Sequence, residues 1–142
     1  MLRRTRTLEP GAWAEDRGRP RILVEDPDGA VRTASQHILE RAGYEVVTCA
    51  GPEPGRRCAE VAAPGCALLR DADVVYTSLD WHRPEHREVL RAQRAHHPDL
   101  PVVVEISRPE GAKQPELLAG CEVVHLPADG ATMVAAVRHA LG

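Results

Sequence analysis

The sequence has few aromatic residues and no long apolar run. Its 142 residues include no phenylalanine, and aromatic residues make up only 3% of the chain. A core must therefore be built from Val, Leu, Ile and Ala, which leaves little room for a deep aromatic pocket. No apolar run approaches the roughly 20 residues of a membrane-spanning helix, and the charged N-terminus is unlike a signal peptide. We therefore expect a cytoplasmic protein that has no membrane partner.

Common metal-binding and phosphate-binding motifs are also missing. The four cysteines form no C-x-x-C pair, and none has zinc-finger spacing with a histidine. They are expected to be small, partly buried apolar side chains. No glycine-rich phosphate loop follows the first apolar run. Because the net charge is −3, the chain has no general attraction to nucleic acid, which is not expected as a partner.

One segment, His82 to His86, satisfies the H-x-x-E-H pattern of zinc peptidases. That mechanism needs both histidines one turn apart on a helix, and Pro84 would leave His82 outside the helix. We therefore predict that the protein is not an enzyme. The remaining histidines have no ligand spacing and are expected to face solvent: His37, His96, His97, His125 and His139.

Short apolar runs alternate with segments of helical periodicity along the chain. Strands are predicted at residues 21–26, 44–49, 74–77 (extendable to 79), 102–107 and 122–127. Helices are predicted from residue 28 to 42, around 56–63, at 85–96, in shortened form within 108–121, and at 130–141. On the first helix the expected inner face is Val31, Ala34, Ile38, Leu39 and Ala42.

This alternation predicts a doubly wound α/β domain, with a five-stranded parallel sheet between two helical layers. We expect the domain to span residues 21–142, preceded by a flexible N-terminal tail over residues 1–20 that only Leu8 and Trp13 could anchor. Ligands of such sheets bind outside the carboxyl ends of the strands. The residues at those ends are therefore the candidate site.

Several stretches resemble the receiver domain of bacterial two-component response regulators: ILVED, LERAGYEVVTC, DVVYTSLDW, HPDLPVVV and GCEVVHLP. The resemblance covers residues 21–141 and implies a flavodoxin-like fold with strand order 2-1-3-4-5. It also implies a site made of an acidic pair after strand one, a phosphorylated Asp after strand three, a Thr or Ser after strand four, and a Lys-Pro pair after strand five. Mg²⁺ held by carboxylates would offset the charge of the phosphoryl group.

Only part of that set is present here. Glu25 and Asp26 match the acidic pair and, with Asp80, are the Mg²⁺ ligands that the resemblance implies. Pro127 matches the proline after strand five, whose preceding bond is expected to be cis, as in the family. The residue before it is Leu126, which brings no cation. The position of the Thr or Ser after strand four falls on Ile106, which has no hydroxyl. The neighbouring Ser107 could replace it only if the strand end were shifted by one. These two residues are further switch positions.

The phosphoacceptor has two alternative positions. A match without gaps to the following helix places Ser78 there, and a serine cannot form an acyl phosphate. The alternative, Asp80, begins a D-x-x-x-P stretch like that of the family. It requires a strand two residues longer, in which positions 78 and 80 would point to the same side. We take Asp80 as the acceptor candidate.

These observations predict an atypical, partly degenerate receiver that acts by protein–protein interaction. We expect a stand-alone module without an output domain, within a two-component phosphorelay, with weak or absent aspartyl phosphorylation. Expected partners are a histidine kinase or another signalling protein, and a homodimer is a further expectation. Two alternatives stay open: a phosphorylation-independent pseudo-receiver, and a small metal- or ligand-binding enzyme of flavodoxin-like fold.

Overall fold

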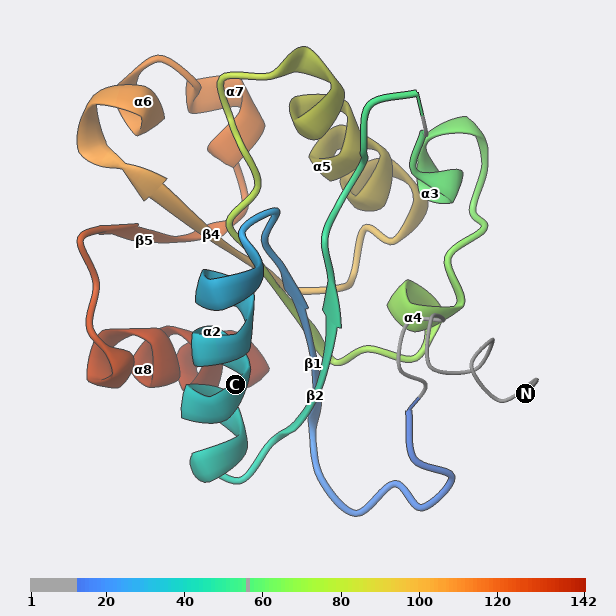
Figure 1. Ribbon diagram of the computed structural model, residues 1–142, viewed down its shortest axis with the longest axis vertical. Coiled ribbons are helices and arrows are strands. Elements are labelled where there is room, and N and C mark those ends of the chain that lie inside the picture. Colours follow the sequence, from blue (N-terminus) through green and yellow to red (C-terminus); the bar gives the residue numbers. More distant parts are fainter. Residues whose placement is uncertain (1–12, 56) are drawn as a thin grey trace.

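The computed structural model describes residues 13–55 and 57–142. Five parallel strands form one sheet in the order β2-β1-β3-β4-β5, which confirms the predicted topology (Figure 1). The strands are β1 (Arg21–Glu25), β2 (Glu45–Cys49), β3 (Val74–Thr77), β4 (Val102–Ser107) and β5 (Glu122–Leu126). The helices are α2 (Gly29–Arg41), α3 (Ala59–Ala62), α4 (Ala67–Arg70), α5 (Pro84–His96), α6 (Arg108–Ala112), α7 (Pro115–Leu118) and α8 (Gly130–Leu141). Within the described part of the chain, none of these helices has the length and apolarity to cross a membrane.

Local sequence signals set the ends of the longer helices. The Asp28 side chain caps α2 by accepting hydrogen bonds from the backbone N–H groups of Ala30 and Val31. The chain leaves α2 at Gly43, whose φ of 104° is a conformation that glycine adopts without strain. Pro84 begins α5, as its fixed φ and missing N–H favour.

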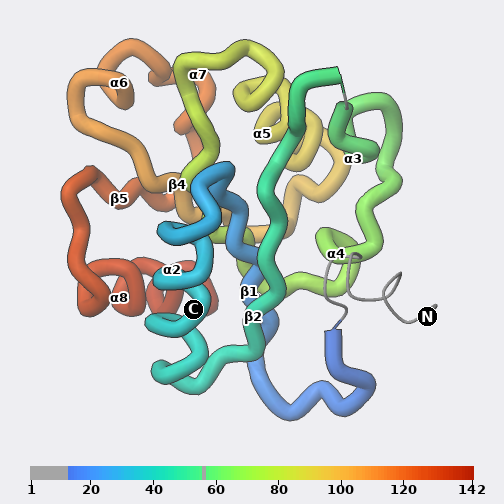
Figure 2. The backbone as a smooth tube through the Cα atoms, viewed as in Figure 1, coloured from blue at the N-terminus to red at the C-terminus, as the bar shows by residue number. Residues whose placement is uncertain are grey.

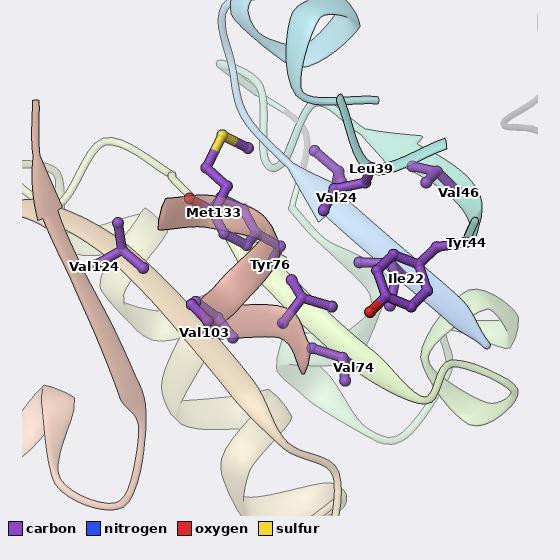
Figure 3. Close-up of a cluster of buried hydrophobic side chains, with 12 residues drawn as sticks. Ile22, Val24, Leu39, Tyr44, Val46, Val74, Tyr76, Val103, Val124 and Met133 are labelled. Carbon is purple, nitrogen blue, oxygen red and sulfur yellow. The ribbon is translucent and has the colours of Figure 1, made fainter. Parts of the chain in front are cut away.

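Helices cover both faces of the sheet and enclose two apolar clusters. On one face, α2 and α8 pack over a first cluster that contains Ile22, Tyr76 and Val103; Figure 3 shows these side chains gathered with Met133 of α8. On the other face, α5 contributes Val89 and Leu90 to a second cluster. Because side chains alternate along a strand, neighbouring residues of β1 enter different clusters.

Some predicted details of the helices are wrong. On α2 the structure buries Ser35 and Leu39, whereas Val31 is 44% exposed. Ala34 and Ala42, also expected inside, are exposed. The helix therefore turns a narrower face to the sheet than the periodicity predicted, with Ile38 partly buried against the first cluster. Between β2 and β3 the prediction missed α4, which stands apart from α3 beyond a proline-glycine step. The segment after β4, where a shortened helix was predicted, is divided into α6 and α7, and Pro115 begins the second of them.

Residues 13–20, which the sequence assigned to a flexible tail, contact the domain. The Trp13 indole N–H donates to the Leu68 carbonyl at 3.1 Å, and the Arg21 guanidinium lies over the Trp13 ring. Arg17 forms an ion pair with Asp73 at 2.6 Å. Trp13 is therefore the anchor that the sequence suggested, whereas Leu8 and the rest of residues 1–12 lie outside the described residues.

Candidate functional site

The carboxyl ends of β1 and β3 meet at the edge of the sheet where the predicted site residues lie. Glu25 pairs with Thr77 across the two strands, and the Ser78 N–H donates to the Glu25 carbonyl at 2.8 Å. Strand β3 ends at Thr77, so the extension to residue 79 is wrong. Ser78, beside Asp26, is the residue that directly follows the strand.

Asp80 instead lies in the loop between β3 and α5, where its polar groups hold a turn. Its carboxylate accepts from the His82 N–H at 3.2 Å, and its carbonyl accepts from the Arg83 N–H at 3.0 Å. Its own N–H donates to Nδ1 of His86 at 3.0 Å. This acceptor role defines a neutral His86 with its proton on Nε2. Burial lowers the pKa of His86, which favours the same neutral form.

The two adjacent carboxylates, Glu25 and Asp26, lie in different surroundings. Glu25 is buried on the α5 side of the sheet, where one of its oxygens accepts from the Gln93 amide of α5. The other oxygen, Oε1, has no hydrogen-bond partner. Burial raises the pKa of Glu25 to about 7, against the opposing effect of Thr77 and Gln93. A side chain in this position is part of the core and is closed to solvent.

Asp26 lies on the side of Tyr76 and Glu105. The Tyr76 hydroxyl donates to Oε2 of Glu105 at 2.5 Å, a buried contact between β3 and β4. Burial and the neighbouring Glu105 charge both raise the pKa of Asp26, although a hydrogen bond from Asp28 opposes them. Glu105 therefore brings a carboxylate to this edge that the sequence prediction did not include.

The residues do not fit the predicted magnesium site. Glu25 points into the core under α5, Asp26 lies on the other side, and Asp80 holds its own loop. Across residues 13–55 and 57–142, no three His, Cys, Asp or Glu side chains form a group that could hold a metal ion. Mg²⁺ binding at Glu25, Asp26 and Asp80 stays a prediction that this geometry does not support.

The remaining switch positions also differ from the receiver pattern. Ile106 is buried in the core, and the Ser107 hydroxyl caps α6 by accepting from the Glu110 N–H at 3.2 Å. Leu126 is 43% exposed. The bond between Leu126 and Pro127 is cis, as expected from the resemblance.

A cavity of about 220 Å³ opens among these strand ends. It lies between the loop after β3 and the start of α6, which run close together in Figure 2 and approach within 3.6 Å between His82 and Glu110. Its lining combines carboxylates, hydroxyls and apolar side chains: Ser78, Leu79, Asp80, Trp81, His82, Glu105, Ile106, Ser107, Glu110 and Leu126. The residues that line the cavity thus include every predicted site position after β3, β4 and β5 except Pro127.

Neither a protein-family model nor a curated protein matches the sequence, whereas solved structures match its fold. The chain is similar to the N-terminal signal receiver domain of a two-component response regulator from Bacteroides fragilis, with a TM-score of 0.69 and 19% identity over 88% of this chain and 98% of that one. The chain is also similar to a response regulator receiver domain protein from Clostridium thermocellum, with a TM-score of 0.65 and 20% identity over 86% of this chain and 94% of that one. The chain has the receiver fold. An adenylate cyclase from Rhodopirellula baltica also matches, with a TM-score of 0.66 and 17% identity over 87% of each chain.

Within this receiver fold, the histidines of the peptidase-like pattern do not form a pair. His82 precedes α5, as Pro84 requires, and faces Glu110 at 3.6 Å between Nδ1 and Oε1. His86 is buried and engaged with Asp80. The two histidines therefore have different partners and do not form the ligand pair that the H-x-x-E-H pattern describes.

A polar cluster that the prediction missed joins α3 to the end of α5. The carboxylate of Glu60 is fully buried and accepts from the N–H groups of Gly65 and Cys66. Its Oε2 lies 2.7 Å from His96 Nδ1 and 3.0 Å from His97 Nε2, so the prediction that these histidines face solvent is wrong. Burial alone would raise the pKa of Glu60, but these hydrogen bonds outweigh it and hold the pKa below its usual value.

Proposed function

We propose that the protein is a receiver-like signalling module that acts by protein–protein interaction without depending on aspartyl phosphorylation. The observation that carries this proposal is the strand end at Thr77, which leaves Ser78 where the acceptor is expected. A hydroxyl at that position cannot form an acyl phosphate. On this proposal a histidine kinase or another signalling protein recognises the fold itself, and no phosphoryl group passes between the two proteins.

The charges around the site support the same proposal. A phosphoryl group needs cations, and charge-assisted hydrogen bonds to it typically contribute about 1.5–3 kcal/mol each. Here the residue before Pro127 is Leu126, and the side chains that line the cavity include three carboxylates and neither Lys nor Arg. The cavity would therefore repel a phosphoryl group. Asp80 stays the candidate acceptor, and we expect its phosphorylation to be weak at most.

Phosphorylation is tested with acetyl phosphate or beryllofluoride plus Mg²⁺, read by intact mass and by NMR chemical shifts. Wild type and Asp80→Ala should both stay unmodified under conditions that fully modify an ordinary receiver domain. If wild type gains one phosphoryl group and Asp80→Ala does not, phosphorylation independence is refuted.

A gain-of-function variant makes the same test sharper. Ser78→Asp combined with Leu126→Lys restores an acceptor and a cation at the strand ends, and it should become modifiable. Leu126→Lys alone is the matched control and should not. If the double variant folds but stays unmodified, Ser78 does not occupy the acceptor position.

Homodimer formation and cytoplasmic location stay predictions, which sedimentation and cell fractionation would check.

A further inference from the structure

The cavity at the strand ends has the opposite charge from a phosphoryl-binding site. Its lining contributes the carboxylates of Asp80, Glu105 and Glu110. His82 is its only titratable base among the described residues, and it faces Glu110 at 3.6 Å. A concave site with several carboxylates and low-dielectric walls attracts cations and excludes anions.

Glu105 is a largely buried carboxylate at this cavity. The residue is only 6% exposed, and it is one of those that line the cavity. Oε2 accepts from the Tyr76 hydroxyl, but Oε1 accepts no hydrogen bond from any residue that the structure describes. The Trp81 indole N–H donates to the Glu105 carbonyl at 2.9 Å and holds the residue in place. Oε1 is not among the enclosed polar atoms that lack a partner, so it is open to a ligand and can accept a charge-assisted hydrogen bond.

Glu110 supplies a second anionic wall. Its Oε2 accepts from the Gln114 amide at 3.0 Å, and this bond, with the nearby charges of His82, Lys113 and Arg87, lowers the pKa of Glu110. Glu110 is therefore ionised at neutral pH. The Arg87 guanidinium donates to the Trp81 carbonyl at 2.7 Å and is not among the groups that line the cavity.

The apolar part of the lining selects the kind of cation. Trp81 and Ile106 are buried walls, and Leu126 forms an exposed apolar rim. A guanidinium is planar, weakly hydrated and able to lie against apolar and aromatic surfaces, whereas an ammonium is compact and strongly hydrated. A cavity of about 220 Å³ has room for one such side chain. An apolar residue beside the arginine could then cover Leu126.

We infer that this cavity binds an arginine side chain of a partner protein, with the guanidinium paired to Glu105 and Glu110. The preference for a cation follows from the lining, whereas the existence of a protein partner rests on the proposed function. The resemblance to receiver domains implies a phosphorylation site at these strand ends. In the arrangement inferred here, the same strand ends bind a positively charged side chain instead.

The two tryptophans provide a direct test. In a titration of ¹⁵N-labelled full-length protein with Nα-acetyl-arginine amide, the indole N–H resonance of Trp81 should shift saturably, with a Kd in the millimolar range for a single side chain. The Trp13 resonance should stay in place, because Trp13 lies against Arg21 at the amino end of β1. Nα-acetyl-citrulline amide has nearly the same shape without the charge and should cause no saturable shift. Equal shifts with both compounds, or none with arginine, would overturn the cation site.

Substitutions then connect binding to the lining. Glu105→Gln keeps an acceptor for Tyr76 but removes the charge, and it should weaken arginine binding about tenfold. Glu116→Gln on α7 makes the same change of net charge away from the cavity and should bind like wild type. If Glu105→Gln does not fold, Glu110→Gln serves as the second variant with the same expected direction. Unchanged affinity in a folded cavity variant would refute the assignment, and it would leave the result of the acetyl phosphate experiment unaffected.

Discussion

Replacing Glu25 with glutamine should remove a large part of the pH dependence of folding stability. Burial raises the pKa of Glu25 from 4.5 to about 7. The folded protein therefore holds this proton more tightly than the unfolded chain does. As pH rises from 4.5 to 7, folding must keep a proton that the unfolded chain has already released, and above the folded pKa it must bury the charge.

The shift sets the size and sign of the effect. A change of one pKa unit corresponds to about 1.4 kcal/mol, so Glu25 should lower the free energy of unfolding by about 3 kcal/mol between pH 4.5 and pH 8. The penalty is absent below pH 4.5, grows as pH rises, and is complete above about pH 7. Glutamine has the same shape, remains neutral, and can donate to the unpaired oxygens of Thr77 and Gln93.

The measurement is urea unfolding of wild type and Glu25→Gln across this pH range. The variant should gain on wild type as pH rises, by about 3 kcal/mol in total, because every other titrating group is common to both proteins. Glu116→Gln, an exposed substitution, is the matched control and should follow wild type. Parallel stability curves for wild type and Glu25→Gln would show that Glu25 titrates normally, which would refute its burial as an acid.

Three further outcomes are expected. Glu60→Ala leaves two imidazoles and two N–H groups without their acceptor and should cost about 3 kcal/mol at neutral pH; since the Glu60 pKa is lowered, the difference should shrink as pH falls below 4.5, which acid titration of the unfolding free energy will check. Asp28→Ala removes the cap of α2 and should lower stability by about 1 kcal/mol, seen as a lower Tm, whereas an unchanged Tm would contradict the capping role. Trp13→Ala should increase hydrogen exchange at Ala14 and the residues after it while leaving β4 protected; equal protection in both proteins would mean that Trp13 does not anchor the segment.

Local patterns along the chain were sufficient to predict most of the strands and helices. Strand-length apolar runs, the helix cap Asp28 and the helix-starting Pro84 act over a few residues, and each element that they predicted is present. The order 2-1-3-4-5 and the cis bond before Pro127 came from the receiver resemblance, and both are confirmed.

The candidate site was less predictable because its contacts join distant segments. Glu25 and Asp26 are adjacent in sequence, yet strand alternation and the placement of α5 give them different partners. Glu105 has no motif around it, and its importance arises only when Tyr76 and Trp81 meet it from β3 and the following loop. The histidines His96 and His97 were expected in solvent because no nearby residue signals a partner, and Glu60 lies more than 30 positions away.

By itself, the sequence determined the alternation of strands and helices and the lack of a cation before Pro127, and it limited the acceptor to two possible positions. Only the tertiary structure decided that β3 stops before Ser78, that Glu25 is enclosed beneath α5, and that Glu105 turns the strand ends into an acidic cavity. The physical reason is range: propensities and caps operate between neighbours along the chain, whereas burial and charge depend on which distant segments the folded sheet brings together.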